Sequence, residues 1–209
     1  MAHGLWSTLF LGFLMGIKHA FEPDHVVAVT TIASRSNRWY RSSLAGICWG
    51  IGHTATLFLV GMILLVLKGQ ISEKWALSLE FVVGIMLVYL GWSGMRSYRP
   101  VHTPRASYEK SLLVGFVHGL SGSAAMVLLT MTTVKTVVEG ALYILIFGMG
   151  TVVGMFTFST CIGIPFVMTS RNRMIHGVLT QAAAVLSTVY GLYYMYSTAV
   201  SEGLWRMWI

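Results

Sequence analysis

The residues best suited to chemistry lie inside the first hydrophobic stretch, in the string His19–His25, which reads His-Ala-Phe-Glu-Pro-Asp-His. It holds two imidazoles and two carboxylates where a lipid-facing helix would carry neither. A charge near the middle of a bilayer costs roughly 2.5–3.5 kcal/mol on insertion scales, so packing in lipid does not explain them. Imidazole and carboxylate at close spacing are ligands for divalent ions such as Ni, Co, Zn, Mn or Fe. The string therefore predicts a transition-metal site within a membrane.

The composition is that of an integral membrane protein. Of 209 residues, 56% are hydrophobic and 10% are charged, against about 25% charged in an average soluble domain. The net charge of +7 does not indicate a nucleic-acid partner, because the basic residues lie in short connections between apolar segments. The first residues lack the basic region and cleavage site of a secretory signal. We therefore expect the first helix to be retained and residues 1–209 to form a single transmembrane domain.

Six apolar segments are long enough to supply the ~20 residues that span hydrocarbon. They are Leu5–Ala33, Leu44–Leu67, Ser78–Met95, Leu112–Val134, Ala141–Met168 and Gly177–Val200. We therefore expect an all-α integral membrane protein with six transmembrane helices. Pro23 predicts a break in the first helix, because proline has no N–H for the carbonyl four residues back and its ring crowds that carbonyl. That carbonyl belongs to His19, and we expect it to be freed.

The basic residues between the segments predict how the chain is oriented. The first, third and fifth connections carry nine Lys and Arg residues: Arg35, Arg38, Arg41, Arg96, Arg99, Arg105, Lys110, Arg171 and Arg173. The opposite side carries four: Lys68, Lys74, Lys135 and Arg206. By the positive-inside rule, both termini lie on the non-cytoplasmic side of a bacterial plasma (inner) membrane or its organellar equivalent.

The two halves of the chain carry similar strings in the same order. Gly16–Ala20 corresponds to Gly115–Gly119, Gly50–His53 to Gly148–Thr151, and Val88-Tyr89 to Val189-Tyr190. Two copies of a three-helix unit (repeat 1 about 4–98, repeat 2 about 111–200) must enter the membrane from opposite sides, which is the inverted-repeat plan of many secondary transporters. Chance recurrence in glycine-rich helices is the alternative. Small residues allow helices to approach closely in membranes, and we expect this packing role for Gly16, Gly50, Gly52, Gly115, Gly148 and Gly150.

A metal site needs ligands from more than one helix, and the second segment supplies His53. We predict that His19, Asp24, His25 and His53 bind the ion. For a single intramembrane histidine, hydrogen-bonded packing is the commoner role, but the cluster around Pro23 does not fit it. Glu80, near the start of the third segment, is expected at the interface.

Four more residues are candidates for metal binding or gating: Glu22, His118, Ala2 and His3. Glu22 adds negative charge beside the predicted ligands. His118 takes the repeat position of His19, and it is either a second waypoint or a core histidine bonded to Ser121 or Ser123. If Met1 is removed, the amine of Ala2 and the nitrogens of His3 can chelate a planar metal ion, the alternative being a disordered tail.

These motifs resemble those of the nickel/cobalt transporter (NiCoT/NicO) superfamily. His19-x-x-x-x-Asp24-His25 matches its signature, and the longer string Gly16–His25 is similar to that of the smaller, six-helix UreH-like branch. Gly50–Thr54 and Gly115–Ala124 resemble the second- and fourth-helix motifs of that branch. The resemblance implies transport of Ni²⁺ or Co²⁺, with His19, Asp24, His25 and His53 as binding and selectivity residues.

We therefore expect a permease and not an enzyme, with Ni²⁺ or Co²⁺ as substrate and no cofactor. Alternating access or gated passage around a midplane site is the expected mechanism, and uptake is favoured over export. The partners expected are the metal ion, the lipid bilayer and either an accessory subunit or further copies of the chain. The alternatives are a metal-dependent intramembrane hydrolase and a membrane thiol-relay protein using Cys48 and Cys161. Those cysteines do not occupy equivalent repeat positions.

Overall fold

The computed structural model describes residues 2–36, 38–67, 69, 71–96, 104–134 and 136–209, without the side chains of 2–4, 104–107, 123–125, 127–129 and 131–133. Every regular element in these ranges is helical. In chain order they are α1 (Ala2–His19), α2 (Pro23–Ala33), α3 (Trp39–Leu67), α4 (Glu73–Arg96), α5 (Pro104–Thr133), α6 (Val137–Thr169), α7 (Arg173–Tyr196), the π-helical η1 (Ser197–Ser201) and α8 (Leu204–Trp208). The all-α prediction is confirmed, while η1 and α8 were not expected.

Long apolar helices place the chain in a membrane. Among the described residues, α3, α4, α6 and the continuous stretch α7–η1 are each long and apolar enough to cross a bilayer. Their outward faces carry large hydrophobic side chains such as Leu59, Ile63 and Val185, which are about half exposed. Apolar surface of this extent is buried in lipid in an integral membrane protein.

The first apolar segment is interrupted where Pro23 predicts. Helix α1 ends at His19, and α2 begins at Pro23 with Glu22 as its extended N-cap residue. Proline is well tolerated at the first helical position, where its missing N–H has no partner to lose. The carbonyl of His19 is not freed, however, because it accepts a hydrogen bond of 3.0 Å from the N–H of Glu22. That expectation was wrong: the chain turns tightly instead of leaving a helical carbonyl open.

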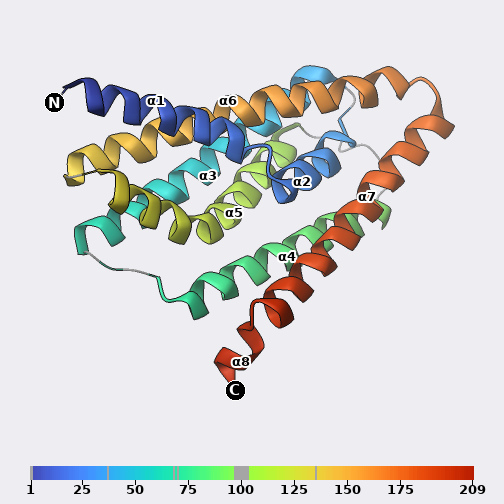
Figure 1. Cartoon of the computed structure of the whole chain (residues 1–209). Helices are drawn as coiled ribbons and strands as arrows, with labels where there is room; N and C mark the ends of the chain where they lie inside the picture. The colour runs from blue at the N-terminus through green and yellow to red at the C-terminus, as the bar shows by residue number, and fades with distance from the viewer. Residues whose placement is uncertain (1, 37, 68, 70, 97–103, 135) are drawn as a thin grey trace.

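The helices form two groups joined through α2 (Figure 1). Helix α3 packs against α5 and α6, and α1 packs along α6. Helices α4 and α7 pack mainly against each other and lie aslant to this bundle (Figure 1). The short α2 contacts α7, α4, α6 and α3. The polar string of α1 and α2 therefore lies where the two groups meet.

Glycines let the bundle helices approach until their backbones touch. A Cβ atom at Gly16 would overlap the carbonyl oxygen of Phe147, and one at Gly115 would overlap that of Trp49. Gly52 and Gly150 lie equally close to the carbonyls of Leu112 and Phe13, respectively. A Cβ atom at Gly50 would lie closest to the Cα atom of Val152, and one at Gly148 would meet the side chain of Thr54. This close packing fixes how α1, α3, α5 and α6 are rotated against one another.

Candidate metal site

Four histidines from four helices converge beside the break between α1 and α2. His19 ends α1, His25 lies in the first turn of α2, and His53 and His118 lie within α3 and α5. His25, His53 and His118 are each at most 1% exposed. The ring of His25 lies at the centre, 4.6 Å from that of His19 and 4.1 Å from that of His118 between centroids. Such a concentration of buried imidazole has no role in apolar packing.

His19, His25 and His53 form one group in which a nitrogen from each ring lies within 4.8 Å of the others. The Nε2 atoms of His19 and His53 are 3.2 Å apart. Two imidazole nitrogens bound to one ion at 2.0–2.1 Å lie about 3 Å apart, so this spacing suits two ligands of a shared cation. Nε2 of His25 is buried and has no hydrogen-bond partner in the described part of the chain. Three imidazoles from α1, α2 and α3 are therefore available to one ion.

Two of these rings are hydrogen-bonded to carboxylates through their Nδ1 atoms. Nδ1 of His19 donates to Oε2 of Glu22 over 2.9 Å, and Nδ1 of His25 donates to Oδ1 of Asp24 over 3.1 Å. A proton on Nδ1 leaves the lone pair of each ring on Nε2, and in His19 this atom faces Nε2 of His53. Metal-binding histidines commonly donate their other N–H to a carboxylate, which fixes the ring and raises its basicity. Glu22 and Asp24 contact Nδ1 of His19 and His25 in the way that such outer carboxylates do.

Asp24 also connects the group to the second half of the chain. Its Oδ2 atom accepts a hydrogen bond of 2.7 Å from Nε2 of His118. Asp24, His25 and His118 form a second group whose ligand atoms lie within 4.8 Å of one another. The hydroxyl of Ser121 donates to the backbone carbonyl of His118, not to its ring. His118 is thus part of the polar centre, and both groups share His25.

The four predicted ligands are brought together, though not as a single set. Asp24 falls in the group with His118, and only His19, His25 and His53 share the other. Ala2 and His3 belong to α1, but their side chains lie outside the described residues, as does that of Ser123. Pro23 starts α2 and so sets the turn that carries both His19 and His25 inward.

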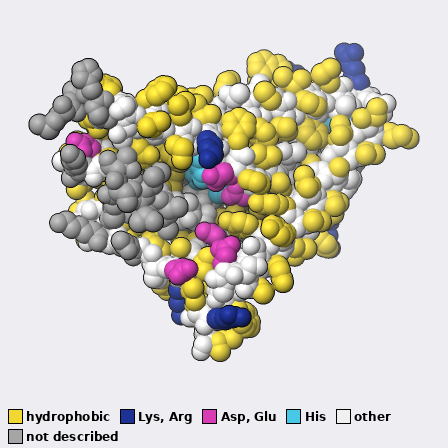
Figure 2. All heavy atoms as spheres, viewed as in Figure 1, with side chains coloured by type: hydrophobic (Ala, Val, Ile, Leu, Met, Phe, Trp, Pro, Cys, Tyr) yellow, Lys and Arg dark blue, Asp and Glu magenta, His cyan; other side chains and the backbone are white. Residues whose placement is uncertain are grey.

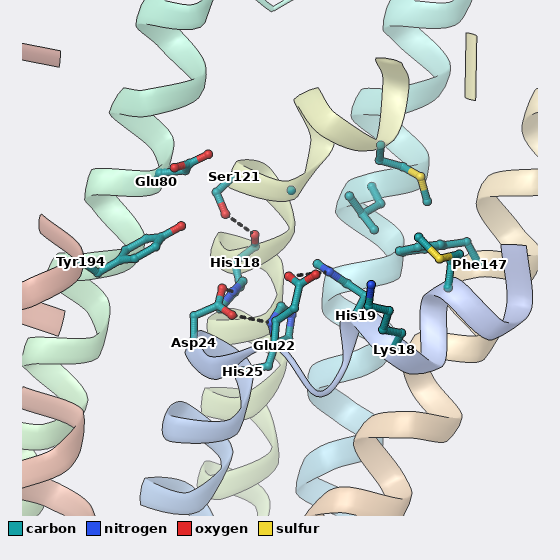
Figure 3. A pocket seen from close by; sticks show the side chains of 14 residues that line it. Lys18, His19, Glu22, Asp24, His25, Glu80, His118, Ser121, Phe147 and Tyr194 are labelled. Atoms are coloured by element: carbon teal, nitrogen blue, oxygen red, sulfur yellow. Dashed lines mark hydrogen bonds and ion pairs between the residues drawn. The ribbon is translucent and has the colours of Figure 1, made fainter. Parts of the chain in front are cut away.

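A pocket of about 270 Å³ opens onto this centre. Figure 2 shows histidine, acidic and basic side chains at a hollow in a face that is otherwise largely hydrophobic. The charged residues that line the pocket are Lys18, Glu22, Asp24 and Glu80. In the close view, Asp24 and His118 lie between His19 on one side and Glu80 and Tyr194 on the other (Figure 3).

Glu80 and Tyr194 belong to the site although the sequence did not place them there. Glu80 was expected at the interface, but it is half-buried and lines the pocket from α4. Tyr194 reaches the same pocket from α7, and its hydroxyl points into the pocket on the side of Glu80 (Figure 3). A carboxylate inside an apolar segment was the available signal for Glu80. For Tyr194 no signal was available, because tyrosine is common in membrane helices.

Comparison with known proteins finds one matching family and several relatives. Residues 5–92 match the NicO family, described as high-affinity nickel-transport protein. The chain is 51% identical to the urease accessory protein UreH of a Bacillus species, over 98% of this chain and 97% of that one. It is 28% identical to a protein of Methanocaldococcus jannaschii provisionally named a nickel/cobalt efflux system, over 68% of this chain and 70% of the other. The nickel transporter NixA of Staphylococcus aureus is 31% identical, over 35% of this chain and 21% of its own. No solved structure matches the chain.

Proposed function

The chain belongs to the NicO family of nickel transport proteins, and we propose from this premise that it carries Ni²⁺ or Co²⁺ across a membrane through the histidine centre. The observation that carries the proposal is the convergence of His19, His25 and His53 from three helices, of which His19 and His25 also line a pocket. Imidazole ligands suit Ni²⁺ and Co²⁺, whereas Mg²⁺ and Ca²⁺ prefer oxygen.

In this proposal the ion is held by the Nε2 atoms of His19, His25 and His53. Glu22 and Asp24 orient the first two rings through Nδ1, at 2.9 and 3.1 Å. A cation that leaves water must recover the energy of its lost hydration, and neutral imidazoles backed by carboxylates supply both lone pairs and negative charge. The remaining coordination positions face the pocket, where water or the next ligand can enter.

The proposed architecture is six transmembrane helices in two inverted repeats, with the broken pair α1–α2 counted as one helix. Packing at the glycines supports it. Gly16 abuts the carbonyl of Phe147, and its counterpart Gly115 abuts that of Trp49. Aligning Gly50 with Gly148 makes Trp49 the counterpart of Phe147. The two contacts are therefore exchanged by the repeat, as a pseudo-two-fold axis requires.

The same alignment suggests a route for the ion. His19 and His118 are equivalent residues of the two repeats, and they flank His25 from opposite sides. We place the ion first at the group containing His19 and then at the group containing His118, with His25 common to both. The ion enters from the side of the termini and leaves toward the basic connections as the α4–α7 pair moves against the bundle. A membrane potential favours entry of a cation by ~2.3 kcal/mol per charge per 100 mV, which favours uptake.

Neither alternative chemistry has comparable support. Cys48 on α3 and Cys161 on α6 are both free, and they do not occupy equivalent repeat positions, as a thiol relay between repeats would require. A hydrolase would share the metal ligands, but the family is one of transport proteins.

Calorimetric titration of the purified protein in detergent with Ni²⁺, Co²⁺, Zn²⁺ and Mn²⁺ tests the proposal. The wild type is expected to bind Ni²⁺ and Co²⁺, and the double variant His19→Ala/His25→Ala is expected to lose that binding. His176→Ala is the matched control, because His176 lies on α7 with Nδ1 beside the carbonyl of Phe166. Unchanged binding in the double variant would reject the site. Uptake of Ni²⁺ into vesicles that carry an imposed potential then gives the direction.

A further inference from the structure

Three of the chain's seven acidic residues face one pocket, and one of them has no role in holding a histidine. Glu22 and Asp24 bond to histidine rings, whereas Glu80 comes from α4 in the other group of helices. We propose that Glu80, which lines the pocket together with Tyr194, is a further metal ligand: the carboxylate that receives the divalent cation before it reaches the histidines. This inference rests on the proposed transport function and assigns a step to a residue that the family motifs do not include.

The position of Glu80 suits a group that meets the ion first. Glu80 and Tyr194 form the wall of the pocket opposite His19, and their polar ends point into it (Figure 3). Both are half-buried. The Tyr194 hydroxyl and the Glu80 carboxylate lie on the same side of the pocket (Figure 3), where the carboxylate can meet a cation. An ionisable residue within an apolar span is energetically costly, and such residues commonly mark the pathway of an ion or substrate.

The charge of the pocket matches a divalent ion. Among the described residues its lining contains one ammonium, from Lys18, and three carboxylates, from Glu22, Asp24 and Glu80. With neutral histidines the lining carries a formal charge of −2, which a dication neutralises. Without Glu80 the formal charge of the lining is −1, which neutralises only half of the charge of a divalent cation. Buried Nε2 of His25 and Nδ1 of His118, in the same pocket, have no hydrogen-bond partner among the described residues, so the interior retains unused ligand atoms.

A polar stripe leads from Glu80 to the C-terminal surface. Thr198 and Glu202 follow Tyr194 at intervals of four residues along α7, η1 and the turn after it. The hydroxyl of Thr198 is buried with no partner in the described part of the chain. Glu202 is exposed at the outer end of this stripe. We place the entry of the cation on this side, between exposed Glu202 and Glu80 in the pocket.

Kinetics of Ni²⁺ uptake into proteoliposomes test the inference. Glu80→Gln removes the charge and is expected to lower the rate at low Ni²⁺ about tenfold and to raise the half-saturating concentration. Glu80→Asp keeps the charge and should restore part of the loss. Glu73→Gln is the matched control, because Glu73 is an exposed residue of the same helix outside the pocket. Tyr194→Phe should shift half-saturation in the same direction by less, with the maximal rate retained.

The possible results separate the inference from the proposed function. If the wild type takes up Ni²⁺ and Glu80→Gln behaves like Glu73→Gln, Glu80 is not a ligand and the transport proposal stands. A loss in Glu80→Gln that is matched by a lower melting temperature and is not relieved in Glu80→Asp assigns Glu80 to structure and also overturns the inference. A wild type that takes up no metal rejects the proposed function and the inference together.

Discussion

Asp24 and His118 lie 94 positions apart in the chain, yet Oδ2 of Asp24 and Nε2 of His118 are 2.7 Å apart. The bond joins the polar string at the start of α2 to the middle of α5. Asp24 holds His25 with its other oxygen, so one carboxylate aligns a histidine from each half of the molecule. Asp24 therefore connects the two groups of candidate ligands, which share His25.

Asp24→Asn should weaken metal binding without abolishing it. The variant keeps the shape of the side chain but loses the charge behind His25 and His118. Loss of a carboxylate behind a metal-bound histidine typically costs roughly 10–100-fold in affinity, and calorimetry with Ni²⁺ measures this directly. Complete loss of binding, equal to that in His25→Ala, would instead make Asp24 a direct ligand.

Glu22→Gln is expected to have a smaller effect than Asp24→Asn. The Glu22 side chain is 50% exposed and that of Asp24 is 15% exposed, so water screens the charge of Glu22 more strongly. Exposed ion pairs contribute at most about 1 kcal/mol, which corresponds to roughly a fivefold change in affinity. The same titration checks the order of the two variants. A larger loss for Glu22→Gln would place Glu22 in contact with the ion.

The metals should rank by their preference for imidazole. We expect Ni²⁺ to bind more tightly than Co²⁺, Co²⁺ more tightly than Mn²⁺, and Mg²⁺ and Ca²⁺ not to compete, since nitrogen ligands favour the later transition metals. Competition titrations at fixed pH give the order. Displacement of Ni²⁺ by equimolar Mg²⁺ would indicate an oxygen-lined site and contradict the histidine assignment.

Gly16→Ala should destabilise the fold even though the change is small. The added methyl group would overlap the carbonyl of Phe147, where backbone meets backbone, and overpacking of this kind costs about 1–3 kcal/mol. Thermal unfolding in detergent should show a lower melting temperature. Gly69→Ala is the control, because the nearest atom to its new Cβ is a Leu64 methyl at 3.5 Å. Equal melting temperatures for both variants would contradict the close approach of α1 and α6.

The predicted orientation can be tested with cysteines in two connections. In a Cys48→Ser/Cys161→Ser background, Ser72→Cys and Arg171→Cys place thiols in the second and fifth connections, where both native residues are exposed. A membrane-impermeant thiol reagent added to intact cells should label only the first, because the positive-inside rule predicts that the arginine-rich connections face the cytoplasm. Labelling of Arg171→Cys alone would invert the topology.

Much of the helical framework could be read from the sequence, because the cost of burying polar backbone in lipid leaves little choice but helices. Hydropathy located the apolar segments, and Pro23 located the break. The helix ends differed by a few residues, since α3 and α4 begin at Trp39 and Glu73, ahead of the apolar segments they contain. The π-helical turn Ser197–Ser201 had no signal, because its residues fit an ordinary helix equally well.

The sequence by itself determined that imidazoles and carboxylates lie within a membrane segment beside a proline, and this was enough to predict a metal site. Only the tertiary structure decided which of them face one another. It set Asp24 behind His25 instead of beside His19, added His118 to the centre and turned Glu80 into the pocket. The physical reason is that a ligand set depends on the rotation of each helix about its axis. That rotation is fixed by contacts such as Gly16 against Phe147, which join residues far apart in the chain.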